Sequence, residues 1–147
     1  YAIGAPELIS SFNKVRNHFG MNRSAQEGAL AALADKTWLR SVQARISASR
    51  LRIATIARAC GLEPLASATN FVAIDCGRDG TFSKRVLDEM VADGVFVRMP
   101  FVAPQNRCIR VSCGAPADLE LLSEVLPQAV QRAEKSPEFP IILNKRV

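Results

Sequence analysis

The sequence predicts an α+β fold in which a long helix packs with a small antiparallel sheet and helices cover one face of that sheet. From about Lys36 to Cys60, apolar and small residues recur every three or four positions, which is the pattern of one face of a long helix. Gly61 follows as a typical C-terminal cap. After Pro64 the pattern changes to short runs rich in β-branched and aromatic residues, which predict strands over residues 70–76, 95–100 and 107–113.

Two further helices are expected among these strands. One covers about 82–92, with Phe82, Val86 and Met90 on one face, and the other covers 116–135. The order strand, helix, strand, strand, helix lets the helices cover one face of the sheet, so the other face is free to meet a partner.

Two shorter helices are expected before the long one, after a strand end at residues 1–5. Pro6 favours a helix start, because proline loses nothing at the first helical position, and this helix runs to about Arg16. Ser24 and Glu27 form an S-x-x-E capping box, which predicts the start of the second helix at an alanine-rich run.

The composition fits a compact domain and disfavours several classes of protein. The chain has 147 residues, of which 48% are hydrophobic, which is enough for one buried core. It carries a net charge of +5, but the arginines of the long helix have no aromatic residues interleaved for base stacking, so a nucleic-acid partner is not expected. That arginine face is either solvated or meets an acidic part of the protein.

The termini and the apolar runs lead to two expectations about the context of the chain. No apolar run reaches the roughly 18 residues of a membrane span, so we expect a cytoplasmic protein without a membrane partner. The chain opens on a strand-like run without an initiator methionine, so we expect a fragment of a longer protein. The tail over 137–147 either packs on the domain or is disordered.

Metal and phosphate-loop chemistry have little support in the sequence. The four cysteines, Cys60, Cys76, Cys108 and Cys113, lack C-x-x-C spacing, so free buried thiols are expected and no metal. The single histidine, His18, lies in a predicted loop without a second ligand nearby. The GRDG run at 77–80 lacks the spacing of a phosphate-binding loop and is expected to be a turn.

Arg110 is the most informative residue, because it lies in the middle of an apolar strand. Side chains alternate along a strand, so Arg110 faces away from Ile109 and Val111. Its guanidinium is a flat fork of donors that suits a carboxylate. Arg98 is a second arginine in an apolar strand, and if the two strands are antiparallel neighbours, both arginines lie on the uncovered face. The alternative for each is an edge-strand arginine reaching water, and the pair gives limited support for an anion site.

Several motifs together resemble a known family. In order along residues 1 to about 133 they are YAIGAPELI, NRSAQEGALAAL, SATNFVAIDCG, GVFVRMP and RCIRVSCGAPADLELL. This set resembles the C-terminal half of a fold type I pyridoxal-phosphate aminotransferase of the histidinol-phosphate aminotransferase-like group. The resemblance implies that residues 1–35 are the end of the large cofactor-binding domain and the interdomain helix, that 36–136 are the small C-terminal domain, and that 137–147 are a tail.

The resemblance also implies a site and a function. Arg110 matches the arginine that grips the substrate's α-carboxylate in that family, which implies an amino acid and a 2-oxo acid as substrates. The strand pairing inferred above, and not the resemblance, is the reason to expect Arg98 beside it. Asn70 is expected near the site mouth of the family, although a sheet-edge role for Asn70 remains open. The resemblance implies that the complete enzyme is a homodimer that functions in amino acid biosynthesis.

The departures from the family pattern limit what this chain can do alone. The family's cofactor lysine and its other cofactor contacts precede the position of Tyr1, so pyridoxal phosphate is expected to be held mainly by a missing N-terminal part. No catalytic or cofactor-binding residue is therefore expected here, and the isolated chain is expected to be inactive. Ser83-Lys84 mimics the Ser-Lys dipeptide, but the G-x-R-x-G run that should follow it is absent.

Two alternatives remain open. The family's histidinol-phosphate enzymes carry a basic residue early in the last helix, and the run ADLELL at 117–122 lacks one, which leaves the substrate open. A phosphoamino acid decarboxylase of the same family is one alternative. The other is a stand-alone, non-catalytic ligand-binding or regulatory module whose two arginines bind an effector.

Overall fold

The computed structural model describes residues 3–17 and 19–135, so His18 and the predicted tail lie outside the described residues. The chain divides into two compact units, one up to residue 42 and one from residue 43 onward. Residues 3–5 form no regular secondary structure, so the strand expected over 1–5 is absent from its described part.

The first unit contains two short helices, α1 (Pro6–Val15) and α2 (Arg23–Ala34), as the sequence predicts. The predicted capping box is wrong, because α2 begins at Arg23 and Ser24 already lies inside it. Asn22 caps the helix instead, its side-chain oxygen accepting a hydrogen bond of 2.7 Å from the backbone N–H of Ala25. Asparagine caps a helix as well as serine does, so the earlier of the two candidates takes the role.

Neither helix of the first unit has a buried residue. Most of their large apolar side chains, and those of the adjoining segments, are exposed by about half or more; these are Ile3, Leu8, Phe12, Val15, Phe19, Met21, Leu30 and Leu33. So many exposed apolar side chains on a short stretch are typical of a surface that meets other protein.

The predicted long helix is confirmed as α3 (Lys36–Ala59). Asp35 precedes it and accepts a hydrogen bond of 2.8 Å from the backbone N–H of Trp38. Gly61, with φ of 74°, follows its end in the left-handed region that glycine adopts most readily. The C-terminal half of α3 buries Ser49, Ile53, Ile56 and Ala57.

The sheet is three-stranded and antiparallel, in the order β1 (Glu63–Pro64), β2 (Phe71–Asp75), β3 (Cys108–Ser112). Its register places Ile74 opposite Ile109 and Ala73 opposite Arg110. The sequence predicted β2 and β3 but missed β1, whose Pro64 disfavours a strand everywhere except at a sheet edge.

The strand predicted over 95–100 is wrong as a strand. Only Arg98 pairs, through an isolated antiparallel bridge to Arg110. Pro100 ends the segment and lacks the N–H that a ladder requires, so pairing cannot propagate beyond it. The alternating apolar residues suggested a strand, and one of them, Val97, is buried in the core even though no strand forms.

Two more helices complete the fold, α4 (Gly80–Ala92) and α5 (Pro116–Lys135), together with a short 3-10 turn at Gln105–Arg107. Asp79 caps α4 by accepting a hydrogen bond of 2.9 Å from the N–H of Phe82, so α4 starts slightly before the predicted position. Arg132 of α5 pairs with Glu89 at 2.5 Å and with Asp93, and so fixes α5 to the end of α4.

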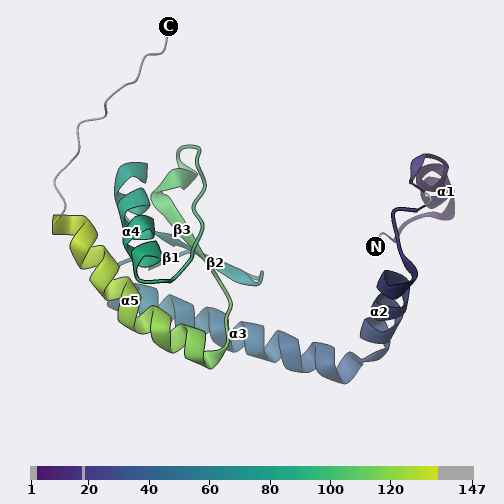
Figure 1. Ribbon diagram of the computed structural model, residues 1–147, viewed down its shortest axis with the longest axis horizontal. Helices are drawn as coiled ribbons and strands as arrows, with labels where there is room; N and C mark the ends of the chain where they lie inside the picture. The colour runs from purple at the N-terminus through teal and green to yellow at the C-terminus, as the bar shows by residue number, and fades with distance from the viewer. Residues whose placement is uncertain (1–2, 18, 136–147) are drawn as a thin grey trace, which may run out of the picture. The chain divides into compact units, whose positions relative to one another are not determined.

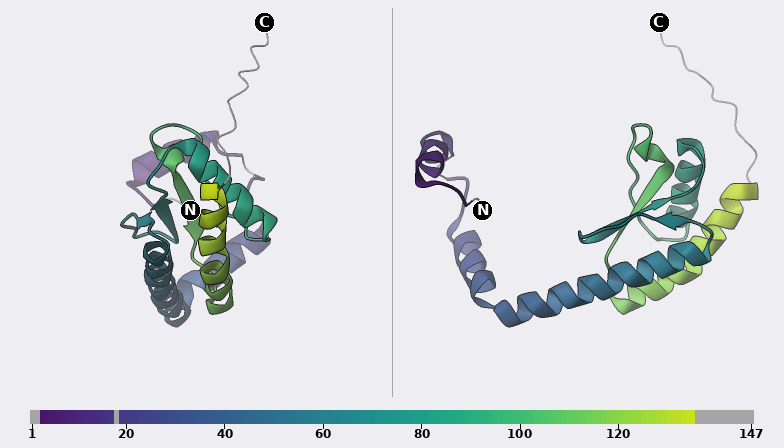
Figure 2. Two further views of the ribbon diagram at one scale, coloured as in Figure 1. Left: turned by 90° about the vertical axis from the view of Figure 1, so that its left-hand side faces the viewer. Right: turned by 180° about the vertical axis from the view of Figure 1, so that it is seen from behind.

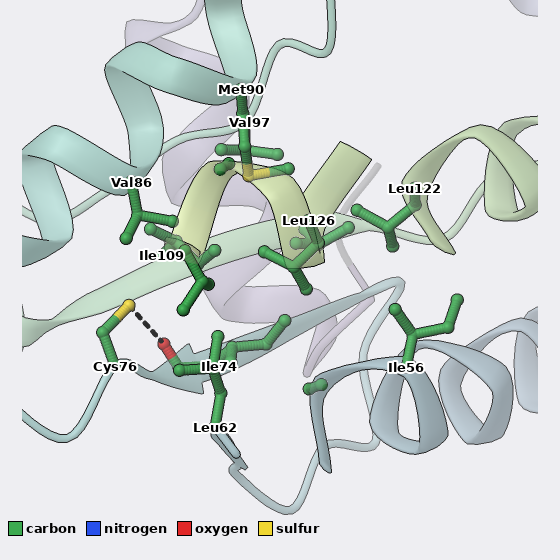
Figure 3. Packing of buried hydrophobic residues seen from close by; sticks show 14 of the residues in the cluster. Ile56, Leu62, Ile74, Cys76, Val86, Met90, Val97, Ile109, Leu122 and Leu126 are labelled. Atoms are coloured by element: carbon green, nitrogen blue, oxygen red, sulfur yellow. Dashed lines mark hydrogen bonds between the residues drawn. The ribbon is translucent and has the colours of Figure 1, made fainter. Parts of the chain in front are cut away.

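The second unit has a hydrophobic core, which forms where α3, α4 and α5 pack against the same face of the sheet (Figures 1 and 2). Figure 3 shows Ile74 and Ile109 of the neighbouring strands among side chains from the three helices, namely Ile56, Val86, Met90, Leu122 and Leu126. Ile74, Ile109 and Leu126 are fully buried. The predicted α+β class, with helices over one face of a small antiparallel sheet, is confirmed.

The two buried serines should respond oppositely to alanine. Ser83 donates a hydrogen bond of 2.7 Å to the carbonyl of Arg107, whereas the Ser49 hydroxyl has no partner among the described residues. Ser83→Ala should lower the free energy of unfolding by about 1 kcal/mol, and Ser49→Ala should leave it unchanged or raise it, because an unsatisfied buried hydroxyl is removed. Urea unfolding of the two variants measures both values, and an equal loss in both would contradict the difference in hydrogen bonding.

Candidate anion-binding site

The site is organised by a backbone pairing between Arg98 and Arg110. The N–H of Arg98 donates to the carbonyl of Arg110 at 3.2 Å, and the N–H of Arg110 donates to the carbonyl of Arg98 at 2.6 Å. Residues paired in this way lie directly opposite each other, and their side chains emerge on the same face. The predicted antiparallel neighbourhood of the two arginines is therefore confirmed, although it involves a single bridge.

Both arginines line one pocket of about 530 Å³. Its other lining residues come from α4 and from the segment leading to the bridge; they are Lys84, Leu87, Phe96, Val97, Met99, Pro100 and Phe101. Three of the lining residues are cationic and none is acidic. The pocket thus combines apolar walls with a concentration of positive charge, which is an environment for an anionic ligand.

Asn70, the third predicted site residue, is not among the residues that line this pocket. Its carbonyl accepts a hydrogen bond of 2.8 Å from the N–H of Cys113, which extends the β2–β3 ladder by one position. The residue itself is exposed. Asn70 thus lies at the end of the β2–β3 ladder, and its role at the site mouth stays a prediction.

The guanidinium of Arg110 contacts the aromatic ring of Phe71, a residue that the sequence alone did not indicate as part of the site. The guanidinium carbon lies 4.7 Å from the centre of the Phe71 ring, a cation–π contact. Phe71 is two residues before Ala73, the partner of Arg110 in the register, so it emerges on the same face of the sheet. Strand alternation around Arg110 would have identified Phe71 if the register had been known.

The two pocket arginines differ from Arg107 and Arg132 of the same unit in lacking an acidic partner. Arg107 donates a hydrogen bond of 2.8 Å to Asp75. Burial alone would raise the pKa of Asp75, but hydrogen bonds from the Gly77 N–H and from Arg107 outweigh it and hold this pKa below its ordinary value. Among the described residues, neither Arg98 nor Arg110 makes a side-chain hydrogen bond or ion pair. Like charges placed opposite each other are unfavourable, and an anion placed between them would reduce this repulsion.

Lys84 is a pocket residue that sequence reasoning considered only as a cofactor lysine. Its ammonium group lies 2.6 Å from Asp88, one helical turn further along α4, and both side chains are about half exposed. Lys84 and Leu87 are three residues apart and so share the face of α4 that lines the pocket. Only the tertiary packing of α4 beside the bridged segment brings Lys84 to the arginines.

The four cysteines are free thiols. Cys76 and Cys108 are buried free thiols as predicted, whereas Cys60 and Cys113 are only half-buried. Burial raises the pKa of the Cys76 and Cys108 thiols, which makes them poor nucleophiles. Within residues 3–17 and 19–135, no group of three or more His, Cys, Asp or Glu side chains could hold a metal ion. Across the same described residues, no helix is both long and apolar enough to span a membrane.

Comparison with known proteins gives consistent matches. A sequence model of the family described as aminotransferase class I and II matches residues 1–126. The histidinol-phosphate aminotransferase of Gluconacetobacter diazotrophicus is 32% identical over a match that covers 90% of this chain and 37% of the relative. Histidinol-phosphate aminotransferase 1 of Cupriavidus pinatubonensis is 31% identical, covering 89% and 35%. The chain therefore spans little more than a third of the length of these curated relatives.

A solved structure matches the fold closely. It is the histidinol-phosphate aminotransferase from Sinorhizobium meliloti in complex with pyridoxal-5'-phosphate, with a TM-score of 0.83 and 48% sequence identity. The match covers 86% of this chain and 35% of that one.

Phe71→Leu should loosen Arg110 without disturbing the core. Removing the ring should cost about 0.5–1 kcal/mol of unfolding free energy, the usual contribution of an exposed cation–π pair. In NMR spectra, the ring-current shift at the Arg110 side-chain N–H should disappear. Phe96→Leu is the control, because Phe96 is 75% exposed and forms no such contact; an unchanged Arg110 signal in Phe71→Leu would contradict the stacking.

Proposed function

This chain belongs to the aminotransferase class I and II family, and from that membership we propose that it is the carboxylate-binding portion of an enzyme that transfers an amino group between an amino acid and a 2-oxo acid. The substrates are related to those of the histidinol-phosphate aminotransferases. Residues 1–35 are the end of the large domain and the interdomain helix, and 36–136 are the small domain. Because the chain spans little more than a third of its relatives, the whole reaction belongs to a longer polypeptide.

The observation that carries the proposal is the pair of arginines without acidic partners in a pocket whose walls are mostly apolar. An amino acid and a 2-oxo acid both carry a carboxylate, and a guanidinium can hold it with two parallel charge-assisted hydrogen bonds. Arg110 suits this role better than Arg98, because it lies on β3 and its head rests on Phe71. Such a grip fixes the orientation of the substrate's α-carbon, which the chemistry requires.

The described residues do not by themselves fit the covalent attachment of pyridoxal phosphate. The lysine that forms such a bond is normally desolvated or otherwise activated. All four described lysines are exposed, namely Lys14, Lys36, Lys84 and Lys135, and Lys84 is ion-paired with Asp88. We therefore assign the cofactor to another part of the longer enzyme and the carboxylate grip to this chain.

The assembly is proposed to be a homodimer. Support comes from the first unit, where the apolar side chains of α1 and α2 remain exposed and neither helix has a buried residue. Exposed apolar patches of this kind mark sites of interaction with other protein surfaces. The rest of the enzyme and a second subunit are the surfaces that the proposal supplies.

The isolated 147-residue chain should not be labelled by pyridoxal phosphate at any particular lysine, because no described lysine has the required setting. Incubation with the cofactor, reduction with borohydride and peptide mapping measure this. A full-length class I and II aminotransferase, treated in parallel, should be labelled at one lysine. Stoichiometric labelling of a single lysine in the isolated chain would overturn the assignment of the cofactor to another part.

Arg110→Leu, made in the full-length enzyme, should lower kcat/KM for amino acids by about two orders of magnitude or more, roughly 3 kcal/mol, because two charge-assisted hydrogen bonds are lost. The absorbance of the bound cofactor should persist. Arg98→Leu should lose less, and Arg52→Leu on the exposed side of α3 is a matched control that should lose nothing.

Full activity of the Arg110 variant on α-amino acids would remove the proposed grip and favour the regulatory-module alternative. Equal damage from the Arg98 and Arg110 changes would mean that both arginines share the carboxylate. Release of carbon dioxide in place of amino transfer would favour the phosphoamino acid decarboxylase alternative.

A further inference from the structure

We propose that Phe71 is a positioning residue for the carboxylate grip, because its ring restrains the guanidinium of Arg110 and leaves the N–H groups of that guanidinium available to a ligand. This role rests on the proposed function, in which Arg110 holds the carboxylate of the substrate. Phe71 is not among the residues that line the pocket. It therefore acts on a bound carboxylate only through Arg110.

Phe71 and Arg110 are diagonal neighbours on one face of the sheet. Phe71 pairs with Ser112 across the β2–β3 ladder, and Arg110 lies two positions before Ser112 on β3. Residues in this relation come within reach of each other when one side chain is aromatic and the other is long. The distance of 4.7 Å between the guanidinium carbon and the ring centre lies within the range of cation–π attraction. The register of the sheet thus places the ring where it restrains the guanidinium.

An aromatic partner suits a ligand-binding arginine better than an acidic partner does. Arg107 is held by Asp75, and this contact uses its Nε–H as a hydrogen-bond donor. A phenyl ring attracts a guanidinium through its π face and has no carboxylate that would neutralise the charge. Arg110 is therefore restrained while its charge and its fork of donors remain available to a carboxylate.

The restraint strengthens binding because a free arginine side chain has many rotamers. Ordering such a side chain when a ligand binds costs free energy, which is lost from the affinity. Repulsion from Arg98, paired directly opposite, also favours rotamers of Arg110 that point away from the pocket. A guanidinium that already lies over the Phe71 ring loses less conformational freedom on binding.

Phe71 is itself firmly placed, as a residue that positions another must be. Its carbonyl accepts a hydrogen bond of 2.5 Å from the Ser67 hydroxyl, and its N–H donates to the Thr69 hydroxyl at 3.3 Å. Arg50 of α3 donates a hydrogen bond of 2.8 Å to the carbonyl of Thr69. The start of β2 is thereby tied to the long helix, and the ring has a fixed base.

The test replaces Phe71 in the full-length enzyme by phenylalanine analogues with one, two or three ring fluorines. Fluorine withdraws electron density and weakens the attraction of the ring for a cation, while the ring keeps nearly the same size and shape. The KM for amino acids should rise stepwise, reaching about two- to fivefold with three fluorines, and kcat should stay nearly unchanged. Phe71→Tyr, which keeps an electron-rich ring, should have the wild-type KM. A residue that only packs would show no such gradient.

Three further measurements serve as controls. The same fluorination at Phe82, whose ring lies 4.5 Å from the guanidinium carbon of Arg78 and does not line the pocket, should leave the KM unchanged. In an Arg110→Leu background, fluorination at Phe71 should have no further effect, because the contact that it weakens is already gone. In the 147-residue chain, NMR relaxation of the Arg110 Nε–H should show more motion in Phe71→Leu than in wild type.

The outcomes separate this proposal from the one on which it rests. If fluorination at Phe71 leaves the KM at the wild-type value while Arg110→Leu still lowers kcat/KM, the role of Phe71 is overturned and the carboxylate grip stands. An equal rise of the KM in the Arg110→Leu background would also overturn it, because the ring would then act independently of the guanidinium. Wild-type kcat/KM in Arg110→Leu would overturn the grip and the role of Phe71 with it, as would a full-length enzyme that transfers no amino group.

Discussion

The alternation of side chains along β3 is the constraint on which both the core and the pocket depend. Ile109 and Val111 point into the layer formed with α3, α4 and α5, and are buried there. Arg110, between them, must therefore emerge on the opposite face. A shift of one residue in the pairing with β2 would bury the guanidinium and expose both apolar side chains, so burial of the core fixes the position of the arginine.

Four arginines of this unit form two pairs with different surroundings. Arg107 and Arg132 are paired with carboxylates and connect elements of the fold, the first to the end of β2 and the second to the end of α4. Arg98 and Arg110 have no such partners in the described part of the chain, and backbone hydrogen bonds hold them side by side. Partnered arginines stabilise the fold, whereas an unpartnered pair in an apolar pocket is suited to bind a ligand.

The first unit and the rim of the pocket both expose large apolar side chains. Phe101 at the rim is 89% exposed, and the apolar side chains of α1 and α2 are also exposed. The chain covers little more than a third of the length of the proteins that it matches. Exposed apolar side chains gathered in this way are typical of surfaces that meet other protein.

Features that follow from side-chain periodicity could be predicted from the residues alone, because periodicity is a local property of the backbone. They are the length of α3, the strands β2 and β3, the helices α4 and α5, and the orientation of Arg110 away from the core. Features that depend on neighbours in space required the folded chain: the single bridge that replaces a strand at Arg98, the edge strand at Pro64, the contact between Phe71 and Arg110, and Lys84 at the pocket. Contacts of this kind join residues far apart in the chain, and no local pattern of side chains specifies which elements pack together.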